Sequence, residues 1–289
     1  MCIDENTRNI INSRLHGLPY LSSIIPLCDC QTRLHFDQYG GNISIGREVE
    51  VEESTVYEIL LGTQVYPQFE TQIVRLEELL LRYPEYRTQD FGRNLIGSFF
   101  SRYSELEVFD ALKRSGYEAS IDPLIAPGIR DSKKADFKIS INEADIYIEL
   151  ITPRLTQPEE ELFQEEPVAG FYDPTVGIVN HHEEFHPVEW KIIQEYTHHF
   201  KIYEPEFATP TIFIADLTYA YSIAGIFGTM DFGSLFARYS FPDYVVGILV
   251  YRTIYHRSRS TKISTLYVNP RFSGASEIPE GLSHIMDFS

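Results

Sequence analysis

The chain of 289 residues is 43% hydrophobic and 13% aromatic, which is enough apolar material for a sizeable buried core. Its formal net charge of −18 excludes broad, non-specific affinity for nucleic acid over the whole surface, because that affinity depends on neutralising phosphates with Lys and Arg. No apolar run approaches the roughly 20 residues that span a bilayer, no signal-peptide pattern is present, and three cysteines are an odd number, so we expect a cytoplasmic protein with reduced thiols.

The N-terminal third mixes strand and helix patterns. Alternating hydrophobic residues over 43–51 predict a strand or hairpin. Apolar residues at helical spacing predict a helix over 68–83, opened by Pro67 and ended by Pro84. A second helical pattern begins near Asp90. We therefore predict an α+β extension over residues 1–94, packed on a core over residues 95–289.

The stretch over 101–154 joins a helix to a hairpin, and each element carries an acid. Helical spacing over 101–115 ends at Gly116, where a helix C-cap belongs. Residues 135–141 alternate as a strand does, residues 142–145 suit a turn, and residues 146–151 form a more apolar strand. The acids on these elements are Glu105, Asp136 and Glu149.

The remainder of the chain has the pattern of an α/β fold. Residues 155–187 form a long acidic connection. Its length and its position directly after Glu149 suggest that it flanks or covers a site there. A helix follows over 188–200, then strands over 211–216, 244–251 and 264–268, with short helices over 219–227 and 231–239. We predict a mixed central β-sheet flanked by helices.

Glu149 interrupts an apolar strand, where a carboxylate is costly to bury unless it is paired or binds a cation. A short hairpin places Asp136 beside it, and Glu105 can approach from the helix. Three converging carboxylates suit a hard cation such as Mg²⁺ or Mn²⁺. The alternatives are a solvated helix face for Glu105, Glu107 and Asp110, a turn residue for Asp136, and an ion pair with Arg154 or a lysine for Glu149.

These residues resemble the PD-(D/E)XK nuclease superfamily, which has the restriction-endonuclease-like fold. Ala135-Asp136 matches the Pro-Asp element, Glu149-Leu150-Ile151 matches the (Asp/Glu)-x-Lys element, and Ser104-Glu105 with Gly116-Tyr117 is similar to the first helix of that family. The resemblance implies hydrolysis of nucleic acid by Asp136 and Glu149, with Mg²⁺ or Mn²⁺ held by these two residues and Glu105. It also allows for a homodimer, since restriction-like enzymes often work as dimers.

One departure from the family pattern bears on activity. The lysine of the motif falls at Ile151, which shares a strand face with Glu149. Some branches of the superfamily supply the lysine from the next helix, where Lys191 is the candidate. The other interpretation is a catalytically degenerate nuclease-fold protein that acts as a protein-interaction module, which the acidic charge also favours.

Two further groups of residues admit a functional interpretation. The concentrated basic residues Arg252, Arg257, Arg259 and Lys262 could contact phosphates, could form a solvated hairpin tip, or could complement the acidic connection over 155–187. Five histidines surround the predicted helix over 188–200, and such a cluster can hold Zn²⁺. Pro187 disfavours a helix at the preceding residue, so we interpret these histidines as surface residues: His181, His182, His186, His198 and His199.

Overall fold

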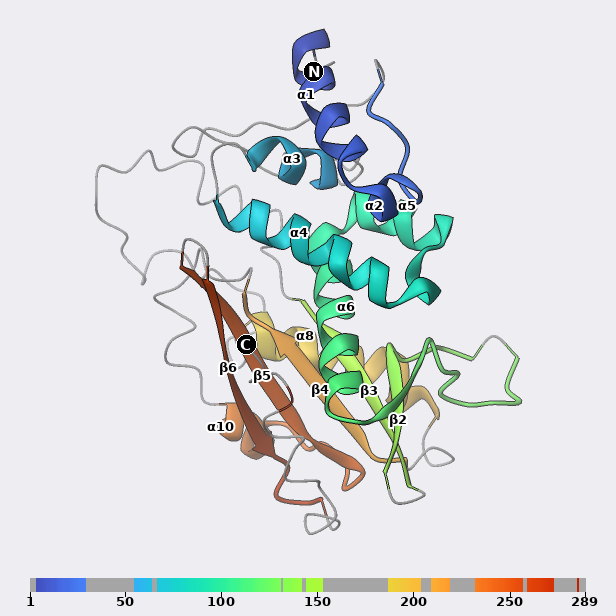
Figure 1. Ribbon diagram of the computed structural model, residues 1–289. Coiled ribbons are helices and arrows are strands. Elements are labelled where there is room, and N and C mark those ends of the chain that lie inside the picture. Colours follow the sequence, from blue (N-terminus) through green and yellow to red (C-terminus); the bar gives the residue numbers. More distant parts are fainter. Residues whose placement is uncertain are drawn as a thin grey trace. The chain divides into compact units, whose positions relative to one another are not determined.

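The computed structural model describes residues 4–29, 55–63, 67–130, 132–141, 144–152, 187–203, 209–218, 232–256, 259–272 and 285 (Figure 1). The chain divides into two compact units, one formed by Met1–Asp110 with Tyr255–Ser260 and the other by Ala111–Ile254 with Thr261–Ser289. The predicted boundary between an extension over residues 1–94 and a core over residues 95–289 stays a prediction. Within the described ranges, no helix combines the length and the apolar character needed to cross a membrane.

The regular elements of the first unit before Asp110 are helical in the part that the structure describes. Asp4 caps the first helix by accepting a hydrogen bond from the Thr7 backbone N–H, and Thr88 caps the helix α5 (Gln89–Gly97) in the same way through the backbone N–H of Phe91. The predicted strand over 43–51 lies outside the described residues. The helical elements are α1 (Glu5–His16), α2 (Pro19–Ser22), α3 (Thr55–Gly62), α4 (Pro67–Arg82), η2 (Pro84–Tyr86), α5 (Gln89–Gly97) and α6 (Phe99–Arg114).

Acidic residues of α6 are buried and paired within this unit. Asp110 is fully buried and accepts hydrogen bonds from Arg75 and Tyr83, while Glu107 accepts one from Arg75. Glu105 is also buried and forms an ion pair with Arg102. The alternative interpretation of these acids as a solvated helix face is therefore wrong, because α6 packs its charged side against arginines of its own unit.

The second unit contains a six-stranded mixed sheet in the order β1-β2-β3-β4-β5-β6 (Figure 1). The first three strands form an antiparallel meander, and β4 and β5 then continue the sheet parallel to β3. The strands are β1 (Glu118–Ile121), β2 (Phe137–Ile141), β3 (Ala144–Ile151), β4 (Thr211–Asp216), β5 (Val245–His256) and β6 (Arg259–Val268). A mixed sheet flanked by helices confirms the predicted α/β class.

Helices cover one face of this sheet. The helix α8 (Pro187–Glu195) continues into the π-helical turn η3 (Tyr196–Phe200) and the 3₁₀ turn η4 (Lys201–Tyr203). Apolar residues of α8, η3 and α10 (Phe232–Arg238) pack against β3, β4 and β5 in one buried cluster, which includes Tyr147, Ile151, Ile192, Phe200, Phe213 and Phe236. The predicted helix over 219–227 lies outside the described residues.

Candidate metal centre

Glu149 is a buried carboxylate in the interior of the sheet. It lies on β3, which has β2 on one side and β4 on the other, and only 5% of the residue is exposed. Its neighbours on the same strand face, Tyr147 and Ile151, belong to the apolar cluster under α8. Burial raises the pKa of Glu149, because the apolar surroundings disfavour the charged form.

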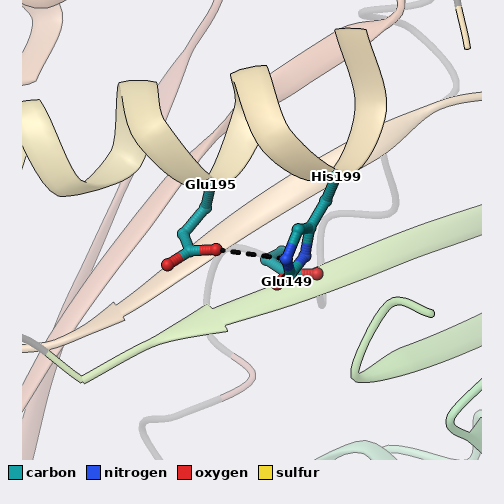
Figure 2. A group of neighbouring side chains, drawn as sticks. All are labelled: Glu149, Glu195 and His199. Atoms are coloured by element: carbon teal, nitrogen blue, oxygen red, sulfur yellow. Dashed lines mark ion pairs between the residues drawn. The ribbon is translucent and has the colours of Figure 1, made fainter. Parts of the chain in front are cut away.

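His199 is the side chain that meets this carboxylate. Its Nδ1 atom lies 2.8 Å from Oε1 of Glu149, and its Nε2 atom lies 3.5 Å from Oε2 of Glu195. The contact with Glu149 raises the pKa of His199, and burial of the ring opposes that shift. The imidazole therefore bridges two carboxylates, one on the strand and one on the helix (Figure 2).

The local helix geometry explains why these groups meet. Lys191, Glu195 and His199 are four residues apart, so successive members lie one above another on a helix face. Nζ of Lys191 lies 2.6 Å from Oε1 of Glu195. His199 belongs to the π-helical turn η3, and turns of this kind occur often at functional sites. The result is a continuous chain of contacts from Lys191 through Glu195 and His199 to Glu149.

Asp136 lies beside Glu149 across the β2–β3 hairpin. The register pairs Phe137 with Ile148, which puts Asp136, the residue before β2, level with Glu149. Oδ2 of Asp136 accepts a hydrogen bond of 2.7 Å from the backbone N–H of Leu150. The hairpin thus brings Asp136 and Glu149 to adjacent positions, and one oxygen of Asp136 is engaged by the main chain of β3.

One oxygen of Glu149 has no hydrogen-bond partner. Its Oε2 atom is buried and receives no donor from any residue that the structure describes. Buried polar atoms are almost always paired, so a carboxylate oxygen with no donor is suited to ligate a cation. One donor atom each from Glu149, Glu195 and His199 lie within 4.8 Å of one another, a spacing from which the three could hold a metal ion.

The other predicted site residues are distributed as follows. Glu105 belongs to the first compact unit, so its approach to the hairpin acids stays a prediction. Lys191 is 48% exposed in its side chain and is held by Glu195. Of the basic residues, Arg252 lies on β5 and Lys262 on β6, both half-buried; Arg259 begins β6, and Arg257 lies outside the described residues.

Glu195 and His199 are the residues of this centre that sequence reasoning missed. The interpretation of His199 as a surface residue is wrong, because its side chain is only 27% exposed and contacts a buried carboxylate. The signal was the four-residue spacing of Lys191, Glu195 and His199 on the helix that follows the Glu149 strand. Three of the predicted histidines lie outside the described residues: His181, His182 and His186. The predicted acidic cover over 155–187 also lies outside them, apart from Pro187.

Comparison of the chain with protein-family models, with curated proteins and with solved structures found no match. Two carboxylates and an imidazole can bind a divalent cation, and an orphaned oxygen on the most buried of them fits that role.

Proposed function

We propose that this protein is a metal-dependent nuclease that hydrolyses phosphodiester bonds of nucleic acid, of the PD-(D/E)XK type, with Mg²⁺ or Mn²⁺ as its cofactor. The observation that carries the proposal is Glu149: a buried carboxylate on a central strand, with one unpartnered oxygen and Asp136 level with it on the next strand. Burying a carboxylate in this position costs free energy unless a cation or a proton compensates for its charge.

The residues have separate roles in this proposal. Asp136 and Glu149 hold the cation, and Glu105 is the third carboxylate that the resemblance supplies. When bound, such an ion stabilises charge on a phosphoryl group and lowers the pKa of a bound water. The hydrogen bond from Leu150 to Asp136 fixes the orientation of that carboxylate. Lys191 orients the attacking water, as the cation that replaces the lysine missing at Ile151, with Glu195 holding its ammonium in place.

Substrate binding has to overcome the acidic charge of the chain. The net charge of −18 repels phosphates at long range, so contact depends on a locally basic segment. The residues that we propose for phosphate contact are those of the β5–β6 region, Arg252, Arg257, Arg259 and Lys262. Cleavage should therefore be strongest at low ionic strength and should fall steeply as salt rises.

The test compares cleavage of labelled single- and double-stranded DNA and RNA with Mg²⁺ or Mn²⁺ at low salt. The variants are Asp136→Asn, which keeps an acceptor for Leu150, and Glu149→Gln; the matched control is Asp145→Asn. Asp145 lies on the same hairpin, is 43% exposed in its side chain and pairs with Lys138. We expect both site variants to lose about 100-fold or more in rate, which corresponds to about 2.7 kcal/mol of barrier, and the control to retain most of it.

Two results would overturn the proposal. The first is cleavage that proceeds equally in the wild type and in both site variants, which would trace it to a contaminant or another site. The second is a wild-type protein that cleaves none of the four substrates with either cation. Circular dichroism of each variant shows whether a loss of rate comes from unfolding instead.

The second result would favour the alternative function, a catalytically degenerate nuclease-fold protein that serves as a protein-interaction module. Its supporting observation is Ile151, which is 1% exposed and packed in the apolar cluster under α8. A lysine at the motif position would place a charged group among these buried apolar contacts, which is costly. This alternative predicts a folded protein with no cleavage under any of the conditions above.

A further inference from the structure

We propose that Glu149, Glu195 and His199 form a binding site for a divalent cation of the first transition series, with Mn²⁺ and Zn²⁺ bound more tightly than Mg²⁺. This ligand set differs from the carboxylates that the resemblance implies, because two of its three members come from the helix after the strand. The site shares Glu149 with the proposed hydrolase, and its use in phosphodiester hydrolysis rests on that proposed function. Binding of the cation does not.

The geometry already gathers the three donors. Each residue offers one ligand atom, and these atoms lie within 4.8 Å of one another. Metal bonds to histidine nitrogen and carboxylate oxygen are about 2.0–2.2 Å long, so two ligands of one ion are at most about 4.4 Å apart. A movement of a few tenths of an ångström closes the set around an ion. The side chains of Glu195 and His199, which are 17% and 27% exposed on the helix, can make this movement more easily than that of Glu149, which is 6% exposed.

The second observation is the orphaned oxygen of Glu149. Oε1 of this carboxylate meets His199, whereas Oε2 is buried and has no hydrogen-bond donor within the described part of the chain. Both oxygens share one carbon, so the orphaned atom lies next to the histidine contact. Figure 2 shows Glu195 and His199 descending from the helix toward Glu149 on the strand below. The orphaned acceptor thus lies within the cluster that offers the remaining ligands.

The nitrogen ligand decides which cations fit. Mg²⁺ prefers oxygen ligands and keeps most of its water, whereas imidazole suits Zn²⁺ and other transition metals. For a given site with nitrogen and oxygen donors, affinity rises from Mn²⁺ through Co²⁺ and stays high at Zn²⁺. With His199 as a ligand, we therefore expect Mn²⁺ to bind at least about 10-fold more tightly than Mg²⁺, and Zn²⁺ more tightly still.

The ammonium group of Lys191 competes with the cation for the carboxylate of Glu195. Its ammonium lies 2.6 Å from Oε1 of Glu195, and both a lysine and a divalent ion seek the charge of that group. Replacing Lys191 by Met keeps the aliphatic stem and removes the competing charge. The substitution Lys191→Met should therefore strengthen Mn²⁺ binding several-fold, a gain that a lysine with no link to the site would not produce.

The experiment measures Mn²⁺ binding to the full chain without substrate, after removal of metals with a chelator. Electron paramagnetic resonance of free Mn²⁺ gives the affinity, and calorimetry with MgCl₂ and ZnCl₂ gives the order of cations. The variants are Glu195→Gln and His199→Gln; the matched control is His198→Gln, since His198 is the adjacent histidine and is exposed. We expect one Mn²⁺ per chain, a loss of about 10-fold or more in both site variants, and a control within about twofold of the wild type.

The outcomes separate this site from the proposed hydrolase. Equal Mn²⁺ affinity in the wild type, Glu195→Gln and His199→Gln overturns the site, as does Mg²⁺ binding as tight as that of Mn²⁺. If only Asp136→Asn and Glu149→Gln lose the cation, the ligands are those of the resemblance and the hydrolase proposal stands without this site. If Glu195→Gln and His199→Gln lose Mn²⁺ affinity and the wild-type protein cleaves no substrate, the metal site is supported and the hydrolase proposal is overturned. Because Glu195→Gln keeps the size and shape of the side chain, it keeps the test decisive if His199→Gln unfolds.

Discussion

The buried Asp110 network gives the sharpest prediction about stability. Asp110 has no exposed side-chain surface, and its carboxylate accepts hydrogen bonds from Arg75 at 2.5 Å, from Tyr83 at 2.8 Å and from Arg82. The substitution Asp110→Ala removes the acceptor and leaves the donors in place. We expect the first compact unit to lose much of its free energy of unfolding.

The contacts set the size of this loss. Removing one member of a buried ion pair typically costs about 3–5 kcal/mol. The lower end applies here, because Arg82 is 47% exposed and can return to water, while Arg75 keeps Glu107 at 2.9 Å. Tyr83 then carries most of the penalty, since it is 8% exposed and loses the charged acceptor of its hydroxyl group. We therefore expect a loss of about 3 kcal/mol.

Urea unfolding followed by circular dichroism measures the loss, because the described residues of the first unit before Asp110 are mostly helical. The control is Glu78→Gln, which removes a contact to the same arginine, Arg75, but at 3.5 Å and with 57% of the glutamate side chain exposed. Exposed pairs of this kind contribute less than about 1 kcal/mol. If Asp110→Ala and Glu78→Gln changed the free energy of unfolding equally, the network would not stabilise the unit and the reasoning would be refuted.

Two further predictions concern the same unit. Gly92→Ala places a Cβ against the carbonyl oxygen of Ile24. The change from Gly to Ala normally stabilises a helix by about 1 kcal/mol, but here we expect urea unfolding to show a loss of about 1–3 kcal/mol. A gain in stability would show that α5 and Ile24 are not in contact. Burial first, and then the hydrogen bond to Asp110, raise the pKa of Tyr83 to about 12. The contribution of Tyr83 to folding stability is therefore complete below about pH 10 and is lost as pH rises toward 12. The difference in urea midpoint between the wild type and Tyr83→Phe should shrink over that range, and a constant difference would contradict the assignment.

The hairpin and its acids were predictable because their signals are local. Alternation along residues 137–141 and the apolar run that ends at Ile151 define two strands, and a short turn fixes them as neighbours. Once the strands pair, the register places Asp136 opposite Glu149. The strand β1 was not predicted, since four residues with every second one exposed carry too little pattern to separate a strand from a loop.

The partners of the acids were not predictable in the same way. Whether Glu107 and Asp110 face solvent or an arginine depends on how α4 packs on α6, and the helical period of α6 alone does not reveal that. His199 posed the same problem. Its role depends on the π-helical turn, which changes the angle at which residues after Glu195 leave the helix. Tertiary packing, rather than local propensity, decided both cases.

Glu195 is the residue on which the interpretations of the centre diverge. It contacts Lys191 on one side and His199 on the other, so it can either hold an ammonium in place or ligate a cation. With Ile151 packed in the apolar cluster, β3 itself supplies no positive group beside Glu149, and the compensating charge has to come from the helix. If Glu195 serves Lys191, then Lys191→Met lowers cleavage without changing Mn²⁺ affinity. If Glu195 serves the cation, the same substitution raises that affinity, and the two results cannot be mistaken for one another.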